Sequence, residues 1–199
     1  MWNDRYNRPD YLFGTEPAEF LKVQARHLPS EGRVLVVADG EGRNSVFLAE
    51  RGLMVTAFDY APNALAKAED LAKQKGVEVD FLEADVFAWD WSADSYDAVV
   101  AIFIQFMPPQ LRVAVFEGLK AALKPGGVLL LHGYAPRQVE YGTGGPPVAE
   151  NMYTLPLLEA AFAGFEVLHS ADYDAEIDEG PGHSGLSGLI DYVVRKPVG

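Results

Sequence analysis

The sequence contains no cysteine among its 199 residues. Disulfide bonds, cysteine nucleophiles and thiolate metal sites are therefore excluded. The chain has four histidines, and their positions show none of the paired spacings that are typical of zinc ligands. We therefore predict no metal site. The histidines are His27, His132, His169 and His183.

Basic residues and long apolar runs are also scarce. Lysine and arginine total 16 against 29 aspartate and glutamate, so the formal net charge is -13 and the isoelectric point is about 4.6. Nucleic-acid binding requires a basic face for the phosphates, so we expect no nucleic-acid partner. No apolar run is long enough to cross a bilayer, and the first six residues are unlike a signal peptide. We expect a cytoplasmic monomer or homodimer without a membrane partner.

The length fits one α/β domain, and 49% hydrophobic residues are enough for a sizeable core. No linker, repeat or low-complexity tract divides the chain. We predict a single domain over residues 1–199, in which residues 1–30 form an N-terminal lid and helix. The leader is rich in aromatic residues and either seals the domain core or folds over a ligand; both interpretations stay open. Thr15 is expected to cap the helix that follows.

The central stretch runs from Arg33 to Asp59. It reads as a buried strand over 34–38, a glycine turn, a helix that stops at Gly52, and a second strand over 54–58 that ends on the acid. This is the layout of a nucleotide-binding half of a doubly wound sheet. Gly40 and Gly42 lack a β-carbon, so a ligand can lie against the backbone. Asp59 is placed to accept hydrogen bonds from two ribose hydroxyls, although an ordinary surface Asp beside a turn is the alternative.

The turn favours one kind of nucleotide ligand. A dinucleotide fingerprint has Gly or Ala at its third position, where this chain has Ser45, and no Gly-Lys-Ser/Thr phosphate loop is present. Asp39 within the turn would repel a pyrophosphate but suits a cationic amino group. S-adenosylmethionine (SAM) carries a ribose, an α-amino group and a sulfonium, and it carries no phosphate. We therefore predict SAM as the cofactor.

With these residues in place, the chain resembles class I SAM-dependent methyltransferases. It is most similar to the small bacterial kind related to tellurite-resistance and thiopurine methyltransferases. The runs 40–44 (Gly-Glu-Gly-Arg-Asn) and 124–127 (Lys-Pro-Gly-Gly) carry much of the resemblance, which covers essentially the whole chain. The chain departs from the superfamily at Val36, commonly Asp, at Ala38, commonly Gly, and at Asp39, often a small residue.

The resemblance implies an α/β fold: a Rossmann-like, doubly wound seven-stranded sheet of order 3-2-1-4-5-7-6, with the last strand antiparallel and helices on both faces. Apolar patterns and turn signals predict further helices at 62–75, 110–123 and 154–162, the last capped by Thr154. They predict further strands at 77–82, 98–103, 128–131, 165–177 and 189–195. If the sixth strand is parallel, the hairpin that carries His183 lies on the cofactor side of the sheet.

The resemblance also implies the residues that hold SAM, with Asp85 meeting the adenine amino group. The predicted cofactor-binding residues are Ala38, Asp39, Gly40, Gly42, Arg43, Asn44, Asp59, Tyr60, Asp85, Val86, Ala101 and Phe103.

Methyl transfer from a sulfonium is an in-line displacement, which needs a base only when the acceptor keeps its proton. We predict His132, Tyr134 and His183 as catalytic residues. We predict Tyr11, Gln105, Arg137 and Tyr141 as substrate-binding residues, with Arg137 able to hold an anionic acceptor. The glycine-rich loop over 134–147 is expected to form a wall of the acceptor site. The alternative is that these residues only join the loops together.

The predicted function is SAM-dependent methylation of a small-molecule acceptor. Two alternatives stay open. The first is an NAD-dependent oxidoreductase, which Ser45 and Asp39 disfavour. The second is a non-catalytic SAM-binding protein, which the sequence does not distinguish from an enzyme.

Overall fold

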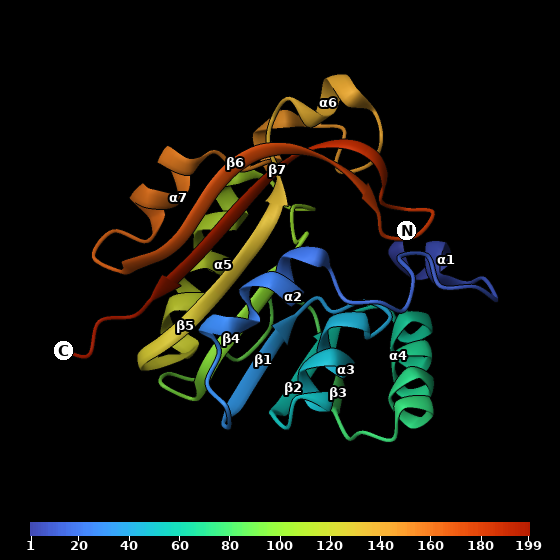
Figure 1. Ribbon diagram of the computed structural model, residues 1–199, viewed down its shortest axis with the longest axis horizontal. Coiled ribbons are helices and arrows are strands. Elements are labelled where there is room, and N and C mark those ends of the chain that lie inside the picture. The colour runs from blue at the N-terminus through green and yellow to red at the C-terminus, as the bar shows by residue number, and fades with distance from the viewer.

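The computed structural model describes residues 1–199 and shows one sheet of seven strands (Figure 1). They are β1 (Arg33–Val37), β2 (Met54–Asp59), β3 (Asp80–Glu83), β4 (Tyr96–Ile102), β5 (Leu123–Tyr134), β6 (Glu166–Asp178) and β7 (Ser184–Arg195). The order across the sheet is β3-β2-β1-β4-β5-β7-β6, as predicted. Strands β1 to β5 are parallel, and β7 runs antiparallel to both β5 and β6. Therefore β6 is parallel to the others, and the β6–β7 hairpin turns at the edge where they end.

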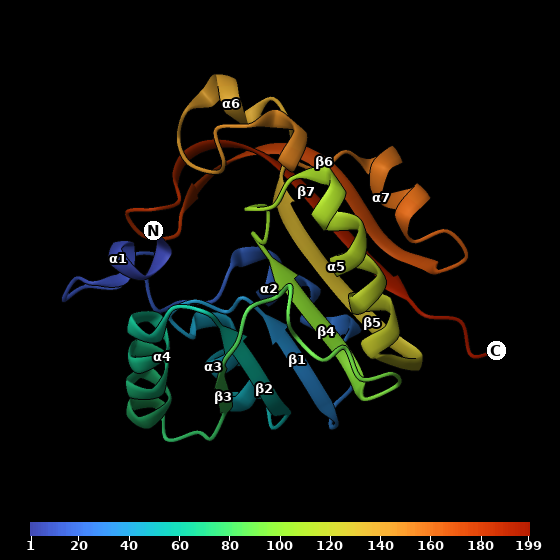
Figure 2. The same ribbon diagram turned by 180° about the vertical axis from the view of Figure 1, so that it is seen from behind.

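Helices cover both faces of the sheet (Figures 1 and 2). They are α1 (Trp2–Tyr6), α2 (Glu19–Gln24), η1 (Ala25–His27), α3 (Arg43–Glu50), α4 (Pro62–Lys75), α5 (Pro109–Ala122), α6 (Gln138–Tyr141), η2 (Ala149–Asn151) and α7 (Leu155–Ala161). Helices α2 and α3 lie on one face, and α5 and α7 lie on the other. Helix α4 packs beside α3, and α1 packs against α4.

The inner strands are apolar on both faces because helices cover both. On β1, Val34 and Val36 join the core beneath α2 and α3, whereas Leu35 and Val37 join the core beneath α5. Burying each such side chain contributes about 1.5–3 kcal/mol. A shift by one residue would exchange the two faces, so this packing fixes which residues emerge where β1 ends.

Two helix starts test the capping predictions. Thr154 accepts a hydrogen bond from the Leu157 N–H at 3.3 Å, as predicted. The prediction for Thr15 is wrong, because α2 begins only at Glu19. Pro17 disfavours helical backbone in the residue before it, and the Ala18 N–H donates to Asn44 Oδ1 at 3.0 Å instead of to a cap.

Strand boundaries differ from the predicted ones where local hydrogen bonds intervene. Strand β3 begins at Asp80 and not at 77, because Val77 still donates to the Ala72 carbonyl at the left-handed end of α4. Strand β7 begins at Ser184 and not at 189, because it pairs with β6 along nearly its whole length. The hairpin tip is therefore short.

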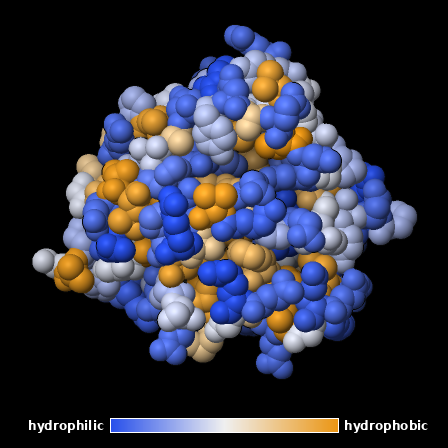
Figure 3. Space-filling model, in the orientation of Figure 1, coloured by the Kyte–Doolittle hydropathy of each residue, from blue (hydrophilic) through white to orange (hydrophobic).

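The surface is mixed in polarity. Hydrophobic residues on the face drawn in Figure 3 form small groups separated by hydrophilic residues. None of the helices is at once long enough and apolar enough to cross a membrane.

Candidate functional site

Two adjoining cavities lie at the edge where β1, β2 and β4 end, with volumes of about 90 and 220 Å³. They share Trp2, Ala38, Asp59, Tyr60 and Phe106, so they form one crevice, which we call the edge crevice. The predicted cofactor residues that line it are Ala38, Asp39, Gly40, Arg43, Asn44, Asp59, Tyr60, Asp85, Val86 and Phe103.

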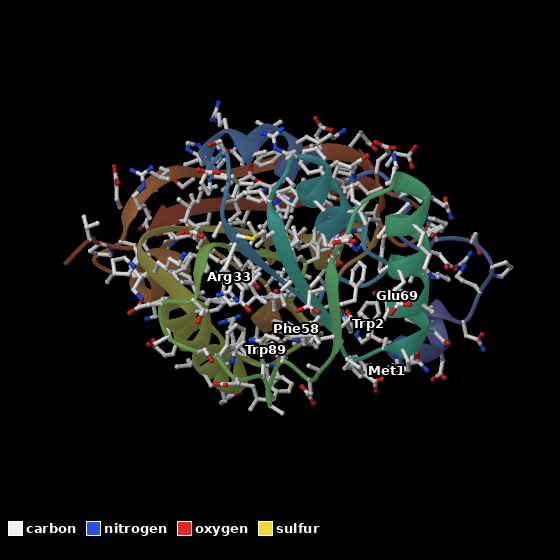
Figure 4. The ribbon with its side chains drawn as sticks, turned by 90° about the horizontal axis from the view of Figure 1, so that it is seen from below. Met1, Trp2, Arg33, Phe58, Glu69 and Trp89 are labelled. Carbon is white, nitrogen blue, oxygen red and sulfur yellow. The ribbon has the colours of Figure 1, made fainter.

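A larger hollow, of about 720 Å³, lies at the opposite end of the strands. Arg33 and Glu69, both labelled in Figure 4, are among its lining residues. It contains none of the predicted site residues and it lies where the parallel strands begin. Ligands of doubly wound sheets bind outside the carboxyl ends of the strands, so the edge crevice is the candidate site.

Asp59 ends β2 at the junction of the two parts of the crevice. Its carboxylate is buried and accepts hydrogen bonds from the N–H groups of Gly40 and Ala61, each at 2.9 Å. Burial raises the pKa of Asp59 above its ordinary value, although these two hydrogen bonds act against the shift. Each carboxylate oxygen keeps a further lone pair. Asp59 can therefore accept two more hydrogen bonds from a ligand in the crevice.

Asp39 lines the smaller part of the crevice. Its carboxylate accepts hydrogen bonds from both the hydroxyl and the N–H of Ser45, in the first turn of α3. Burial raises the pKa of Asp39 to about 7 in spite of these bonds. A cationic group beside it would favour the ionised carboxylate. Val36, where the superfamily commonly has an acid, lines the same part and leaves Asp39 as the acid next to the turn.

The two glycines of the turn serve different purposes. Both have positive φ, 66° at Gly40 and 88° at Gly42. Gly40 lines the crevice, and a β-carbon there would lie 3.0 Å from the Tyr6 hydroxyl. Gly42 does not line it; a β-carbon there would lie 2.7 Å from that of Ala68 on α4. Gly42 thus permits close packing of α3 on α4.

Two residues without glycine's freedom also have positive φ at this edge. Ala38 follows β1 with φ 48°, and Phe103 follows β4 with φ 56°. Such backbone costs on the order of 1–3 kcal/mol for each residue and tends to gather at functional sites. Both residues line the crevice.

The N-terminal leader closes the crevice. The buried carboxylate of Glu41 accepts a hydrogen bond from the Leu12 N–H at 2.8 Å and pairs with Lys67 at 2.7 Å. Trp2 and Tyr6 line the crevice from α1, and the β6–β7 hairpin tip lies beside that helix in Figure 1. Tyr6 and Leu12 are also buried against Ala61 and Ala64, so the leader both packs on α4 and lines the crevice, and its action as a lid stays a prediction.

Arg43 and Asn44 begin α3 and line the crevice. Their polar groups also bind the hairpin and the leader. Arg43 forms an ion pair with Glu179 of the hairpin at 2.8 Å, and both side chains are nearly buried. Asn44 accepts from the Ala18 N–H. These contacts join the leader, the hairpin and the glycine turn into one closed unit.

The larger part of the crevice is mostly apolar. Phe58 and Trp89, side by side in Figure 4, stack at 4.2 Å below it. Asp85 is exposed and accepts from the Phe87 N–H at 2.9 Å, and Val86 is buried against the core. Ala101 lies fully in the core and does not reach the crevice.

The three predicted catalytic residues meet around one ring. The centroid of Phe103 lies 4.2 Å from that of His183, 4.7 Å from that of Tyr134 and 4.9 Å from that of His132. His183 lines the edge crevice. Nδ1 of His183 and the hydroxyl of Tyr134 are buried without hydrogen-bond partners.

His132 is held by contacts of its own. Its Nδ1 is 2.8 Å from Asp191 Oδ1 on β7, and its ring stacks on Phe20 of α2 at 4.6 Å. The Tyr173 hydroxyl donates to the same carboxylate at 3.1 Å. Sequence reasoning missed Asp191, although an acid within the apolar run 189–194 was a usable signal.

The four predicted substrate-binding residues do not reach the crevice. The Tyr11 hydroxyl donates to the Lys67 carbonyl, and the Gln105 amide bridges both backbone groups of Tyr134. Arg137 pairs with Asp172 and Asp174 on β6, and Tyr141 donates to Asp174. The positive charge of Arg137 is thus already neutralised. Of the aromatic residues that do line the crevice, Tyr60 and Phe103 are predicted site residues. The others are Trp2, Tyr6, Phe13, Phe58, Phe87 and Phe106.

The fold and this crevice define a class of protein that comparison with known sequences identifies. Residues 34–127 match the family model described as a methyltransferase domain. This part of the chain is therefore similar to a methyltransferase domain, and sequence similarity to a named methyltransferase extends over 134 residues of the chain. The match bears out the predicted family, whose cofactor is SAM, over residues 34–127.

Particular relatives support this assignment. The chain is 33% identical over 134 residues to the ubiquinone biosynthesis O-methyltransferase of Xanthomonas axonopodis pv. citri, covering 65% of this chain and 54% of that protein. The chain thus spans about half the length of the curated relatives it matches.

Solved structures show the same fold. TehB from Haemophilus influenzae superposes with a TM-score of 0.71 at 18% identity, covering 98% of this chain and 65% of that chain. A protein whose structure concerns conversion of a disulfide bond into a thioacetal group in echinomycin biosynthesis superposes with a TM-score of 0.76 at 19% identity, covering 96% and 86%. At these identities the likeness is one of fold.

Proposed function

We propose that this protein is a SAM-dependent methyltransferase that acts on a small-molecule acceptor. The observation that carries the proposal is the pair of buried carboxylates, Asp39 and Asp59, that line one crevice where neighbouring parallel strands end. One carboxylate suits a ribose and the other suits a cationic amino group. SAM presents both groups on one molecule.

Different lining residues would contact different parts of SAM. Asp59 would hold the ribose hydroxyls, and Asp39 would hold the α-amino group. Asp85, Val86 and the apolar part of the crevice would take the adenine. When bound, SAM supplies an activated methyl group. The chain itself supplies orientation and the exclusion of water, through the lid formed by the leader and the hairpin.

The charge of the crevice opposes the dinucleotide alternative. A pyrophosphate beside the glycine turn would face Asp39 and Asp59 together, and two acids near a phosphate are repulsive. We expect isothermal titration calorimetry to show micromolar or tighter binding of SAM and S-adenosylhomocysteine, on the order of -8 kcal/mol. Saturable binding of NAD without binding of SAM would overturn the proposal.

The small size of the acceptor is supported by the closed lid and by the relative named for ubiquinone biosynthesis. Conversion of SAM to S-adenosylhomocysteine, measured with a panel of phenols, amines, thiols, halides and tellurite, tests it. Turnover with any acceptor excludes a purely SAM-binding role. Binding without turnover across the panel would favour that role instead.

The proposal also covers the domain organisation, the location and the oligomeric state of the protein. We propose that residues 1–199 work as a single domain in the cytoplasm, as a monomer or homodimer. The strongly acidic composition supports the absence of a nucleic-acid partner.

A further inference from the structure

A third cavity, of about 470 Å³, lies between the leader, α2 and β6. We call it the α2–β6 cavity. Its lining combines polar and acidic residues with hydrophobic side chains that include Phe13, Phe20, Tyr173, Ile177 and Leu189. This volume lies within the range that holds small organic ligands.

His132 is the most buried polar residue that lines this cavity. Its side chain is 3% exposed, and Phe20 and Phe103 hold the ring at centroid distances of 4.6 and 4.9 Å. Nδ1 is bound to Asp191, whereas Nε2 has no hydrogen-bond partner within the protein. Because His132 lines the cavity, Nε2 is available to a ligand there.

Asp191 determines whether Nε2 of His132 accepts or donates a hydrogen bond. It receives hydrogen bonds from His132, His169 and Tyr173. Although burial acts to raise the pKa of Asp191, its hydrogen bond and charge interaction with His132, together with the hydrogen bonds of His169 and Tyr173, lower it below its ordinary value. A carboxylate accepts from Nδ1, so a singly protonated His132 ring carries its proton on Nδ1, and Nε2 keeps its lone pair.

Charge restricts the ligand further. The rim of the cavity carries five carboxylates, and of these only Glu19 and Glu179 are paired with a cation, Lys22 and Arg43 respectively. The rim therefore repels anions. A neutral ring that carries a hydroxyl fits the hydrophobic side chains of the lining, offers a donor to Nε2 and is not repelled by the rim.

The cavity adjoins the edge crevice. Phe13 lines both spaces, and the Phe103 ring contacts both His132, which lines the cavity, and His183, which lines the crevice. A molecule in the α2–β6 cavity therefore lies beside the crevice proposed for SAM.

We propose that the α2–β6 cavity is the methyl-acceptor site, and that it takes a neutral ring compound whose hydroxyl donates to Nε2 of His132. This inference rests on the proposed function, because it assigns the acceptor side of the same reaction.

Calorimetric titration of the full chain, saturated with S-adenosylhomocysteine, tests the ligand class. The probes are 4-methylphenol, the anion 4-methylbenzoate, and 4-methylanisole, which lacks the hydroxyl proton. We expect saturable binding of 4-methylphenol and at least about tenfold weaker binding of the other two, the loss of one hydrogen bond. The ¹⁵N resonance of His132 Nε2 should shift on addition of 4-methylphenol and not of 4-methylanisole.

Variants locate the binding. Ile177→Trp fills the cavity from β6 without touching the His132–Asp191 pair, and it should weaken 4-methylphenol binding at least about tenfold. Val167→Trp, at an exposed position of the same strand, is the matched control and should leave it unchanged. His132→Phe keeps the ring stack and removes Nε2, so it should also weaken 4-methylphenol binding at least about tenfold. Circular dichroism establishes that this variant folds.

Two results separate this inference from the proposed function. If S-adenosylhomocysteine does not bind the wild-type chain, the proposed function fails. If S-adenosylhomocysteine binds, three results would overturn the acceptor-site inference alone. These are no binding of 4-methylphenol, binding no tighter than that of 4-methylbenzoate, and binding of 4-methylphenol that Ile177→Trp leaves unchanged.

Discussion

The Asp39 carboxylate accepts two hydrogen bonds from Ser45, one from the hydroxyl and one from the N–H. Both residues are buried beneath the edge crevice. These bonds oppose the effect of burial but do not cancel it, since the pKa of Asp39 is raised to about 7. The charge of Asp39 is therefore unfavourable for the fold and favourable for a cationic ligand.

The first prediction concerns stability. A carboxyl whose pKa is higher in the folded chain stabilises the fold at low pH, and this contribution is lost as the pH rises through about 7. Asp39→Asn removes the ionised form, so it should raise the free energy of unfolding at pH 8 by about 1–4 kcal/mol. Urea denaturation at pH 8 and pH 5 measures this. The difference from wild type should shrink at pH 5, and Asp85→Asn, at an exposed site, should show neither effect.

The second prediction concerns the pH dependence of SAM binding. An ammonium group beside Asp39 favours its ionised form, so binding should release a proton below pH 7. Affinity should fall by up to about tenfold per unit as the pH drops from 7 to 5.5. Calorimetry in buffers of different ionisation enthalpy counts the proton. In Asp39→Asn the slope should flatten, and a slope of unchanged size there would assign the proton to another group.

The sequence predicts those features of the structure that depend on the course of the backbone. Apolar runs locate β1 and β2, and because parallel strands end at one edge, Asp39 and Asp59 had to come together there. The hairpin that carries His183 follows from the direction of β6. The role of Gly42 could not be predicted in the same way. The space left by its missing β-carbon is filled by Ala68 of α4 and not by the crevice.

Side-chain pairing across distant segments could not be predicted. Arg137 seemed free to hold an anion, but Asp172 and Asp174 on β6 lie opposite it and neutralise it. The alternating acids of β6 were visible in the sequence; which cation faces them depends on the β6–β7 register. The register of β5 with β7 brings Asp191 opposite His132.

The third prediction tests the ribose contact. Asp59→Ala removes a charged acceptor, and hydrogen bonds to charged groups contribute about 1.5–3 kcal/mol each. Affinity for S-adenosylhomocysteine should fall by more than about tenfold while the circular dichroism spectrum persists. Asp90→Ala removes an exposed acid and serves as the control. Unchanged affinity in a folded Asp59→Ala protein would remove Asp59 from the site.

The fourth prediction tests the lid. Glu41 receives the N–H groups of Leu12 and Phe13, so Glu41→Ala should expose them. Amide hydrogen exchange at these two positions should become at least about tenfold faster, the equivalent of about 1.4 kcal/mol of local opening. Glu41→Gln keeps one acceptor oxygen and should show a smaller effect. Equal protection in wild type and Glu41→Ala would mean that other contacts hold the leader.

The last prediction concerns the unpaired polar atoms of Tyr134 and His183, whose ring centroids are 5.7 Å apart. Burial raises the pKa of Tyr134 and holds that of His183 well below its usual value, so both are neutral at pH 7. A buried polar group without a partner costs about 1–3 kcal/mol. Tyr134→Phe and His183→Phe should therefore keep or raise the free energy of unfolding, by up to about 2 kcal/mol.

If these atoms serve the acceptor, the same variants should lower turnover of SAM while leaving its affinity nearly intact, because neither residue belongs to the predicted cofactor contacts. Urea denaturation, calorimetry and SAM consumption with an acceptor from the panel measure the three quantities. Tyr173→Phe is the control for stability, since its hydroxyl is paired with Asp191 and its loss should lower the free energy of unfolding by about 0.5–1.5 kcal/mol. Unchanged turnover in both variants would leave the two side chains with a packing role around Phe103 and no part in catalysis.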